Sequence, residues 1–499
     1  MVILSLILPS LLFVLSALYI FHIQLRSAGA EPPLVKGRIP ILGVALKFLY
    51  EPGAFLEGLR KNKGWIYTLY VGGRKMTLVS DPVIGMKQVW TQHRNFSAQV
   101  FFTFLNKELF KYSDAINYDK GFQEALRLKL LQVFSNKSNL ASIVETLRGT
   151  YKGFVDETSG FCETEEVIDL YNFARYKMYS ASAIAVFGPS FPIEEMYKDY
   201  IAFEDSLMSF IRKTPRFLNP SGYKARDRVL ELIGDFFMNE EKVAQSSVLV
   251  RGLCEEFKKA EYRHTRPVDF AGYFLSIVFA SKSNSVPAAF WYVAHIISDP
   301  ELKAEIERII VANYNNESGS FDWDALFADK VLVSCFKETT RLVSNAASGR
   351  AITRDTMLKV ADPLHHGADG KEIVKEYFLH KGDNVLMIGN LVHWDPEAYP
   401  EPMKWIGKRF LDENRGKLVK HVDEWRSYVP WGGGGHMCPG RHLALIEAVV
   451  QCVYILWYFD VEPIDKVPKM FIKDKYGSGV IRPEDSFNVK FKRRIVPLA

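Results

Sequence analysis

The sequence predicts a mainly helical protein with small peripheral β-sheets, an α+β arrangement. Helical periodicity dominates from residue 81 to residue 342, with clear examples at residues 125–134, 229–237, 270–298 and 322–342. Strand-like segments are short and lie toward the two ends of the chain, at residues 65–70, 76–80, 384–386 and 486–491. We find no repeat and no second linker after residue 45, so residues 46–499 are predicted to form one globular unit.

The composition excludes several classes of protein. With 48% apolar and 24% charged residues, the chain is not disordered, collagen-like or a coiled coil. The formal net charge of +5 is spread along 499 residues, whereas nucleic-acid binders usually carry a concentrated basic face. The five cysteines lie far apart and form no CxxC pair, which argues against a disulfide framework and a structural zinc site. A reducing compartment is therefore expected, and no nucleic-acid partner.

The N-terminus carries an apolar run at residues 2–23. At about 1.5 Å per residue it spans roughly 33 Å as a helix, enough to cross a bilayer core of about 30 Å. A cleaved signal peptide is the alternative, because residues 28–30 (Ala-Gly-Ala) resemble a cleavage site. The run is longer than a usual signal-peptide core and no Lys or Arg precedes it, so we expect a transmembrane signal-anchor at residues 1–25.

The flanking charges predict the orientation of this anchor. Arg26, Lys36 and Arg38 follow the apolar run and no basic residue precedes it, so the positive-inside rule places the rest of the chain in the cytosol. A single-pass protein of the endoplasmic reticulum membrane is expected. Residues 26–45 contain three prolines and are predicted to form a stiff, non-helical linker.

The most specific motif is Trp-Gly-Gly-Gly-Gly-His-Met-Cys-Pro-Gly-Arg at residues 431–441. Consecutive glycines let the backbone turn with positive φ and approach a flat ligand closely. Cys438 then precedes an apolar helix predicted at residues 441–458, whose dipole favours a thiolate at its N-terminus. As an axial ligand of a haem iron, such a thiolate donates electron density that favours O–O cleavage. A phosphate-binding loop and an inert buried cysteine remain alternatives, although no Gly-Lys-Ser/Thr follows.

This segment resembles the haem-binding signature of cytochromes P450, Phe-x-x-Gly-x-Arg-x-Cys-x-Gly. Gly434, Cys438 and Gly440 match the signature, while Trp431 replaces its Phe and His436 its Arg. The resemblance implies the cytochrome P450 fold, haem b as cofactor and Cys438 as the axial ligand of the haem iron. His436 is then expected to hydrogen-bond a haem propionate, although its charge near neutral pH is less constant than that of Arg.

Other motifs support the resemblance in the expected order. Glu338 and Arg341 lie three residues apart on a predicted helix, a spacing that alone most often indicates a solvated pair. In the family this Glu-x-x-Arg motif joins a later Arg, here Arg409, in a buried structural network. Residues 381–385 and 393–396 also resemble the family. The Trp-x-x-x-Arg propionate motif appears as Gln-x-x-x-Arg127, and Arg350 lies where relatives often place another propionate ligand.

The helix expected over the haem departs from the family pattern. Most members carry an acid and a threonine that relay protons during oxygen activation, whereas this chain has Ser283 and Asn284. An amide can hold a water but does not ionise. Asn284 could equally lie at a kink caused by Pro287. The stretch is similar to the branch that contains bile-acid-pathway sterol hydroxylases and prostacyclin synthase, so Ser283 and Asn284 are carried over as catalytic candidates.

The resemblance implies a membrane-bound monooxygenase that oxidises, most simply by hydroxylation, a bulky lipophilic substrate such as a sterol, terpenoid or polyketide. It would use dioxygen and electrons from an NADPH–cytochrome P450 reductase, since no flavin or nicotinamide domain fits in this chain. Substrate contacts are expected at residues 97–105, 207–217, 273–284, 344–351 and 475–480. A haem-thiolate isomerase or dehydratase that needs no reductase, and a non-catalytic haem-binding membrane protein, are the alternatives.

Overall fold

A computed structural model describes residues 14, 16–18, 30–157, 164–259, 266, 269–366, 372–412, 417–418, 428–470, 477, 479–494 and 498. The predicted anchor at residues 1–25 lies almost wholly outside the described residues. Residues 26–29 of the predicted linker and residues 475, 476 and 478 of the last predicted substrate segment also lie outside them. The three-residue stretch 16–18 is helical.

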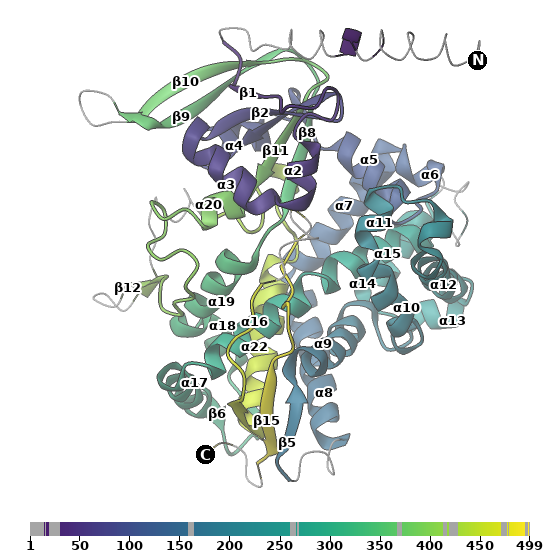
Figure 1. The fold of residues 1–499 in the computed structure, drawn as a ribbon. Coiled ribbons are helices and arrows are strands. Elements are labelled where there is room, and N and C mark those ends of the chain that lie inside the picture. Colours follow the sequence, from purple (N-terminus) through teal and green to yellow (C-terminus); the bar gives the residue numbers. More distant parts are fainter. Residues whose placement is uncertain are drawn as a thin grey trace, which may run out of the picture.

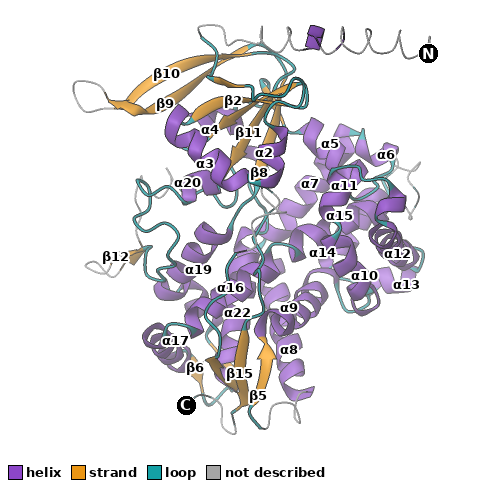
Figure 2. Ribbon diagram, viewed as in Figure 1, coloured by secondary structure: helices purple, strands orange, loops and turns teal. Residues whose placement is uncertain are grey.

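The described part of the chain has a large helical body with strands gathered at two ends, so the predicted helical fold with small sheets is confirmed (Figures 1 and 2). The N-terminal half of the body contains α2 (Ala45–Tyr50), α3 (Pro52–Lys63), α4 (Gly85–Thr91), α5 (Gln99–Glu108), α6 (Asp114–Asn117), α7 (Lys120–Ser135), α8 (Lys137–Glu157), α9 (Leu170–Phe187), α10 (Ile193–Asp205), α11 (Leu207–Ile211) and η1 (Arg216–Leu218). The C-terminal half contains α12 (Pro220–Phe237), α13 (Glu240–Ala244), α14 (Val248–Phe257), α15 (Phe270–Lys282), α16 (Ser285–Ile297), α17 (Pro300–Ala312), α18 (Trp323–Ala328), α19 (Lys330–Val343), α20 (Asn390–His393), η4 (Gly434–His436) and α22 (Arg441–Tyr458).

The largest sheet has six strands in the order β1-β2-β3-β11-β8-β4. Its strands are β1 (Leu34–Val35), β2 (Ile66–Val71), β3 (Arg74–Val79), β4 (Phe96–Ser97), β8 (Ala347–Ile352) and β11 (Asn384–Ile388). The hairpin β2–β3 pairs through β3 with β11 in parallel, and β11 pairs antiparallel with β8. This sheet joins segments from both ends of the chain and places β8 beside α5, which carries expected substrate contacts.

The remaining strands form small sheets. β14 (Phe459–Pro463), β15 (Asn488–Arg493) and β5 (Glu166–Asp169) form an antiparallel sheet at the opposite end of the molecule (Figure 2). A long antiparallel hairpin consists of β9 (Thr356–His366) and β10 (Glu372–Leu379). Two short pairs are β6 (Tyr314–Asn315) with β7 (Ser320–Phe321), and β12 (Leu411–Asp412) with β13 (Lys417–Leu418).

The described part of the predicted linker is not a free-standing connection. Leu34 and Val35 pair in parallel with Thr68 and Leu69 of β2. The Phe378 N–H also donates to the carbonyl oxygen of Ala30 at 2.7 Å. Residues 34–35 therefore form an edge strand of the sheet beside β2, and Ala30 is bonded to β10.

The helix expected at residues 270–298 is interrupted at Ser283 and Asn284, between α15 and α16. Pro287 explains the position of this break, because a proline cannot donate to the carbonyl four residues earlier, here that of Ser283. The Ser283 hydroxyl instead donates to the carbonyl oxygen of Phe279 at 2.7 Å. The segment expected at residues 322–342 is likewise divided, and the Asp329 carboxylate caps the start of α19 by accepting from the N–H groups of Val331 and Leu332.

The helix predicted at residues 441–458 is observed with those bounds as α22. It packs against α8, α16, α17, α18 and α19, and most of its residues from Glu447 to Trp457 are buried in the main apolar core. Among the described residues, the stretch Gly434–Tyr458 is the one long and apolar enough to span a membrane, but its position identifies it as a core helix.

Candidate functional site: a cysteine turn at the start of a core helix

The turn before Cys438 is shaped by contact with Trp90 on α4. Gly432 and Gly434 have positive φ values of 65° and 63°, which side chains other than hydrogen disfavour. A Cβ atom on Gly433 would overlap the Trp90 ring, and one on Gly434 would overlap the Trp90 carbonyl oxygen. The glycines therefore allow the turn to lie directly on Trp90, a contact that nothing in the sequence indicated.

Cys438 is partly buried immediately before α22. Its N–H donates to the Trp431 carbonyl oxygen at 3.0 Å. Burial raises the pKa of its thiol, while the N–H groups of Gly440 and Arg441 and the charge of Arg441 act in the opposite direction. The N–H groups that face the sulfur thus come from the start of α22 and not from the four consecutive glycines. A bound metal ion would overcome the effect of burial, because coordination deprotonates a thiol outright.

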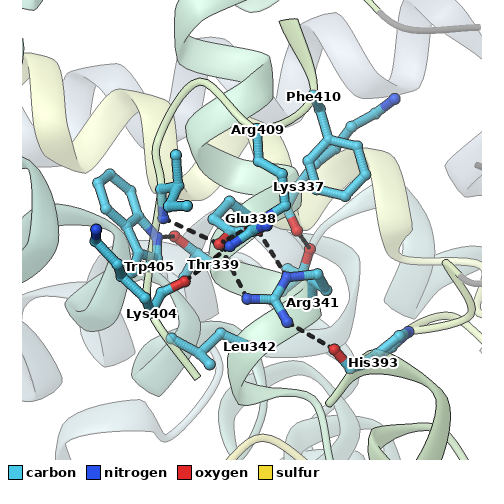
Figure 3. A network of polar contacts seen from close by, with 12 residues as sticks. Lys337, Glu338, Thr339, Arg341, Leu342, His393, Lys404, Trp405, Arg409 and Phe410 are labelled. Atoms are coloured by element: carbon cyan, nitrogen blue, oxygen red, sulfur yellow. Dashed lines mark hydrogen bonds and ion pairs between the residues drawn. The ribbon is translucent and has the colours of Figure 1, made fainter. Parts of the chain in front are cut away.

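The structure brings Glu338, Arg341 and Arg409 together in one network of ion pairs (Figure 3). Glu338 and Arg341 on α19 are both 0% exposed, and the Glu338 carboxylate accepts two hydrogen bonds from Arg341, at 2.7 and 2.9 Å. Arg409 Nε donates to both oxygens of the same carboxylate at 3.0 Å, and the Ile406 N–H donates to one of them at 3.0 Å. Mutual pairing of this kind is what allows charged groups to persist in a protein interior.

His393 connects this network with the cysteine turn. Its carbonyl oxygen accepts from Arg341 at 2.7 Å, and its Nε2 accepts from the Val429 N–H at 2.9 Å, at the start of the turn. Burial lowers the pKa of His393 to about 3, so the ring is neutral and its Nε2 is free to accept. The Tyr428 hydroxyl also lies 2.7 Å from the Thr340 hydroxyl of α19. The network therefore fixes the entry of the turn, a role that the sequence motif at residues 393–396 did not reveal.

Arg127 and His436 lie on the outer side of the turn. Arg127 on α7 pairs with Glu124 and also donates to the Gly435 carbonyl oxygen at 3.1 Å. The His436 ring packs near Phe102, with centroids 5.4 Å apart. Partial burial and then the charges of Arg350 and Arg127 lower the pKa of His436, so at neutral pH it offers one N–H donor and no charge.

Arg350 on β8 is a buried cation close enough to His436 for its charge to act on that ring. It is 4% exposed and donates to the Ser348 hydroxyl at 2.9 Å and the Gly349 carbonyl oxygen at 2.8 Å. Among the described residues no carboxylate pairs with it, and burial lowers its pKa. Trp90 Nε1 is also buried without a hydrogen-bond partner in the described part of the chain. Together with Cys438, these groups fit a flat cofactor that carries carboxylates, such as haem b.

Arg350→Met is expected to weaken haem retention by about 10- to 100-fold, because a hydrogen bond to a charged group contributes about 1.5–3 kcal/mol. The rate of haem transfer to excess apomyoglobin measures this effect. Arg127→Met is the matched comparison and should have a smaller effect, because the Arg127 guanidinium already has Glu124 as its counter-ion. Equal haem loss from the two variants would contradict the assignment of Arg350.

Asn284 lies at the break between α15 and α16 and contacts a distant loop. Its side-chain oxygen accepts from the Val480 N–H at 3.0 Å, and Gly479, at a φ of 128°, passes directly over it. Among the described residues, the Asn284 amide nitrogen has one hydrogen-bond contact, with the Ala280 carbonyl oxygen at 3.4 Å. The side-chain N–H groups of Asn284 therefore remain the ones most available to a ligand or water, whereas Ser283 donates to its own helix.

The expected substrate segments are also brought together where they are described. α5 contacts β8, α11 and α15, and Ser97 pairs with Ala351. The C-terminal loop pairs with the segment before β8, through Ser344 with Val480 and Ala346 with Gly477. Segments far apart in the sequence thus converge around the break between α15 and α16.

Comparison with known proteins agrees with this geometry. The cytochrome P450 family model matches residues 32–491. The chain is 25% identical over 499 residues to cytochrome P450 7B1 of Mus musculus, covering 96% of this chain and 94% of that protein. It is 27% identical to 7-alpha-hydroxycholest-4-en-3-one 12-alpha-hydroxylase of Oryctolagus cuniculus, covering 94% of each, and 26% identical to cholesterol 7-alpha-monooxygenase of Cricetulus griseus, covering 95% of each. A family match over nearly the whole chain, with the cysteine turn and the buried Glu–Arg network in place, shows that the chain belongs to the cytochrome P450 family of haem-thiolate monooxygenases.

Proposed function

We propose that this protein hydroxylates a sterol, with haem b held by Cys438 and electrons supplied by an NADPH–cytochrome P450 reductase. The observation that carries the substrate class is the similarity along nearly the full length to enzymes whose names specify sterol substrates. The predicted anchor supports a location in the endoplasmic reticulum membrane with the catalytic domain, residues 46–499, in the cytosol. A sterol partitions into that membrane, where the enzyme would receive it.

The haem, when bound, supplies the site at which dioxygen is activated. Cys438 would hold it from the start of α22, and Arg350, Arg127 and His436 would bind its carboxylates. The Glu338–Arg341–Arg409 network keeps the turn in position through His393. These residues bind and orient the cofactor, and none of them transfers a proton in the reaction.

Asn284 is the residue that would hold a proton-carrying water beside the haem. Its oxygen is committed to the Val480 N–H, so the water is held by the amide nitrogen. The same contact fixes the loop at residues 479–480, which borders the substrate side. Asn284 therefore both positions this loop and offers a donor at the break in the helix, while Ser283, within the break, donates back to the Phe279 carbonyl oxygen of α15.

The experiment that tests the function supplies labelled dioxygen, NADPH and reductase to the holoenzyme with cholesterol and its oxidised derivatives. One labelled oxygen atom in a hydroxylated product is the expected result. Product formed at full rate without reductase or dioxygen would contradict the proposal and support a haem-thiolate isomerase, a possibility raised by the absence of the usual acid and threonine. Absence of turnover with every sterol would remove the sterol assignment.

Asn284→Ala is expected to lower product formation by about 10²–10³-fold, the usual effect of removing one hydrogen-bond donor from a catalytic site. Haem content should remain, and NADPH use should be diverted to hydrogen peroxide. Asn284→Asp separates the two roles of the residue, because a carboxylate still accepts from the Val480 N–H but provides no N–H group. If Asn284→Asp and Asn284→Ala both retained full coupling of NADPH to product, Asn284 would have no part in proton supply.

A further inference from the structure

A buried polar network lies beside the break between α15 and α16. Lys282, the last residue of α15, and Glu447 of α22 are each 2% exposed, and Ser182 of α9 is 0% exposed. Lys282 Nζ donates to the Ser182 hydroxyl oxygen, and the Ser182 hydroxyl donates to the Glu447 carboxylate. One chain of hydrogen bonds thus connects three helices in the interior of the protein.

The network also reaches the other side of the break. The Ser285 hydroxyl, at the first position of α16, lies close enough to the Glu447 carboxylate to act on its pKa. The same hydroxyl lies 2.5 Å from the Ser281 carbonyl oxygen of α15. Of the residues on either side of Ser283 and Asn284, Lys282 is therefore connected to Glu447 through Ser182, and Ser285 lies near the same carboxylate.

Such a network is costly to bury and must be held by its own contacts. Burial lowers the pKa of Lys282 to about 8, and the negative charge of Glu447 acts in the opposite direction. Burial likewise raises the pKa of Glu447, against the charge of Lys282 and the hydroxyls of Ser182 and Ser285. From α8, the Tyr151 hydroxyl faces Glu447, and burial followed by that negative charge raises the pKa of Tyr151. Among the described groups, Glu447 is the charged one that acts on Lys282.

We propose that Lys282 is a positioning residue for the oxygen-activation segment. By tying the end of α15 through Ser182 to Glu447, it sets the break at which Asn284 accepts from the Val480 N–H. Lys282 is bonded to Ser182 of α9 and through it to α22, whereas Asn284 accepts from Val480 in the loop at residues 479–480. The two side chains therefore connect the break to different parts of the protein. The consequence for catalysis rests on the proposed function, but the positioning itself does not.

Hydrogen exchange of the holoprotein tests the positioning directly. The peptides that contain residues 280–286 and 479–482 are compared in wild type, Lys282→Met and the control Lys303→Met. Lys303 on α17 is half-buried, and its Nζ donates to the Val461 carbonyl oxygen of β14 at 3.0 Å. Lys282→Met is expected to raise exchange in both peptides by about 10-fold or more, since the break loses its tether, while Lys303→Met leaves them unchanged. Equal exchange in Lys282→Met and wild type would overturn the proposal.

The pH dependence of hydrogen exchange distinguishes a specific effect of the Lys282 amine from a general loss of packing in the variant. The pKa of Lys282 is lower in the closed state than in an opened one, so raising the pH above about 8 favours the closed state through this group by up to about 10-fold per pH unit. We therefore compare the protection of residues 479–482 in wild type with that in Lys282→Met, after correction for intrinsic exchange. The difference in protection should rise between about pH 8 and pH 10. Contributions from other titrating groups are common to both proteins and therefore cancel in the difference. A flat difference would contradict the role of Lys282.

Two further variants keep the test decisive if Lys282→Met folds poorly. Lys282→Gln retains a donor for Ser182 without the charge, and Lys282→Met combined with Glu447→Gln removes both charges together. Partial recovery of protection in either variant is expected. In turnover with reductase, Lys282→Met should release about 10-fold more peroxide per product than Lys303→Met, since small displacements of a reacting group are costly. If wild type formed no product, the proposed function would fail while the exchange result still decided the role of Lys282.

Discussion

Cys438→Ala is expected to abolish thiolate ligation of the haem iron. Cys438 is the cysteine at the end of the glycine turn, with two backbone N–H groups facing its sulfur. Alanine offers no ligand, so the variant should lose haem or bind it without the electron donation that O–O cleavage requires. The spectrum of the reduced carbon monoxide complex measures the ligand directly, because a thiolate gives a band that other ligands do not.

The matched control is Cys254→Ala. Cys254 is also a free cysteine, buried on α14, and it lies outside the turn. This variant should keep the thiolate-type spectrum and most of its haem. A thiolate-type spectrum retained in Cys438→Ala would show that another residue is the ligand, and the assignment of the site would be wrong.

Glu338→Gln is expected to destabilise the fold by about 3–5 kcal/mol, the usual cost of removing one partner from a buried charge network. The amide cannot balance Arg341 and Arg409, and Arg341 is 0% exposed. Since a folded protein is stable by only about 5–15 kcal/mol, most of the variant should fail to accumulate as holoprotein. The yield of haem-loaded protein and the midpoint of urea unfolding measure this loss.

Glu231→Gln is the control for sequence spacing. Glu231 pairs with Arg228 on α12 at three residues' separation, as Glu338 does with Arg341, but both side chains are largely exposed. Water solvates the remaining partner there, so little change in the unfolding midpoint is expected. Similar midpoints for Glu338→Gln and Glu231→Gln would mean that the buried network does not hold the cysteine turn in place.

Several parts of the fold were predictable because they depend on local sequence. The bounds of α22 follow from an apolar run that begins after Pro439 and Gly440, and the four predicted strands correspond to β2, β3, β11 and β15. The linker and the two divided helices were not predicted in full. Their structures depend on pairing with β2, on the carbonyl group that Pro287 leaves without a donor, and on a cap at Asp329.

The candidate site likewise contains residues that the sequence identified and residues whose role only the structure revealed. Cys438 and its turn could be identified from the sequence, since glycine and cysteine are required there by backbone geometry and iron chemistry. Trp90 and His393 could not, because their contacts with the turn depend on helices separated from it by hundreds of residues or by a loop. The substrate class came from similarity to relatives and not from the geometry of the site.

The sequence by itself predicted the family, Cys438 as the candidate haem ligand and the residues of the Glu–Arg network, because each is a fixed spacing of chemically distinctive residues. Only the tertiary structure decided what Lys282, Glu447 and Asn284 contact. In the sequence, Lys282 is a charged residue in an apolar helix, and its spacing does not reveal a partner 165 residues later. Burial and pairing are properties of the packed interior, so the network beside the break became visible only when α9, α15, α16 and α22 were in place.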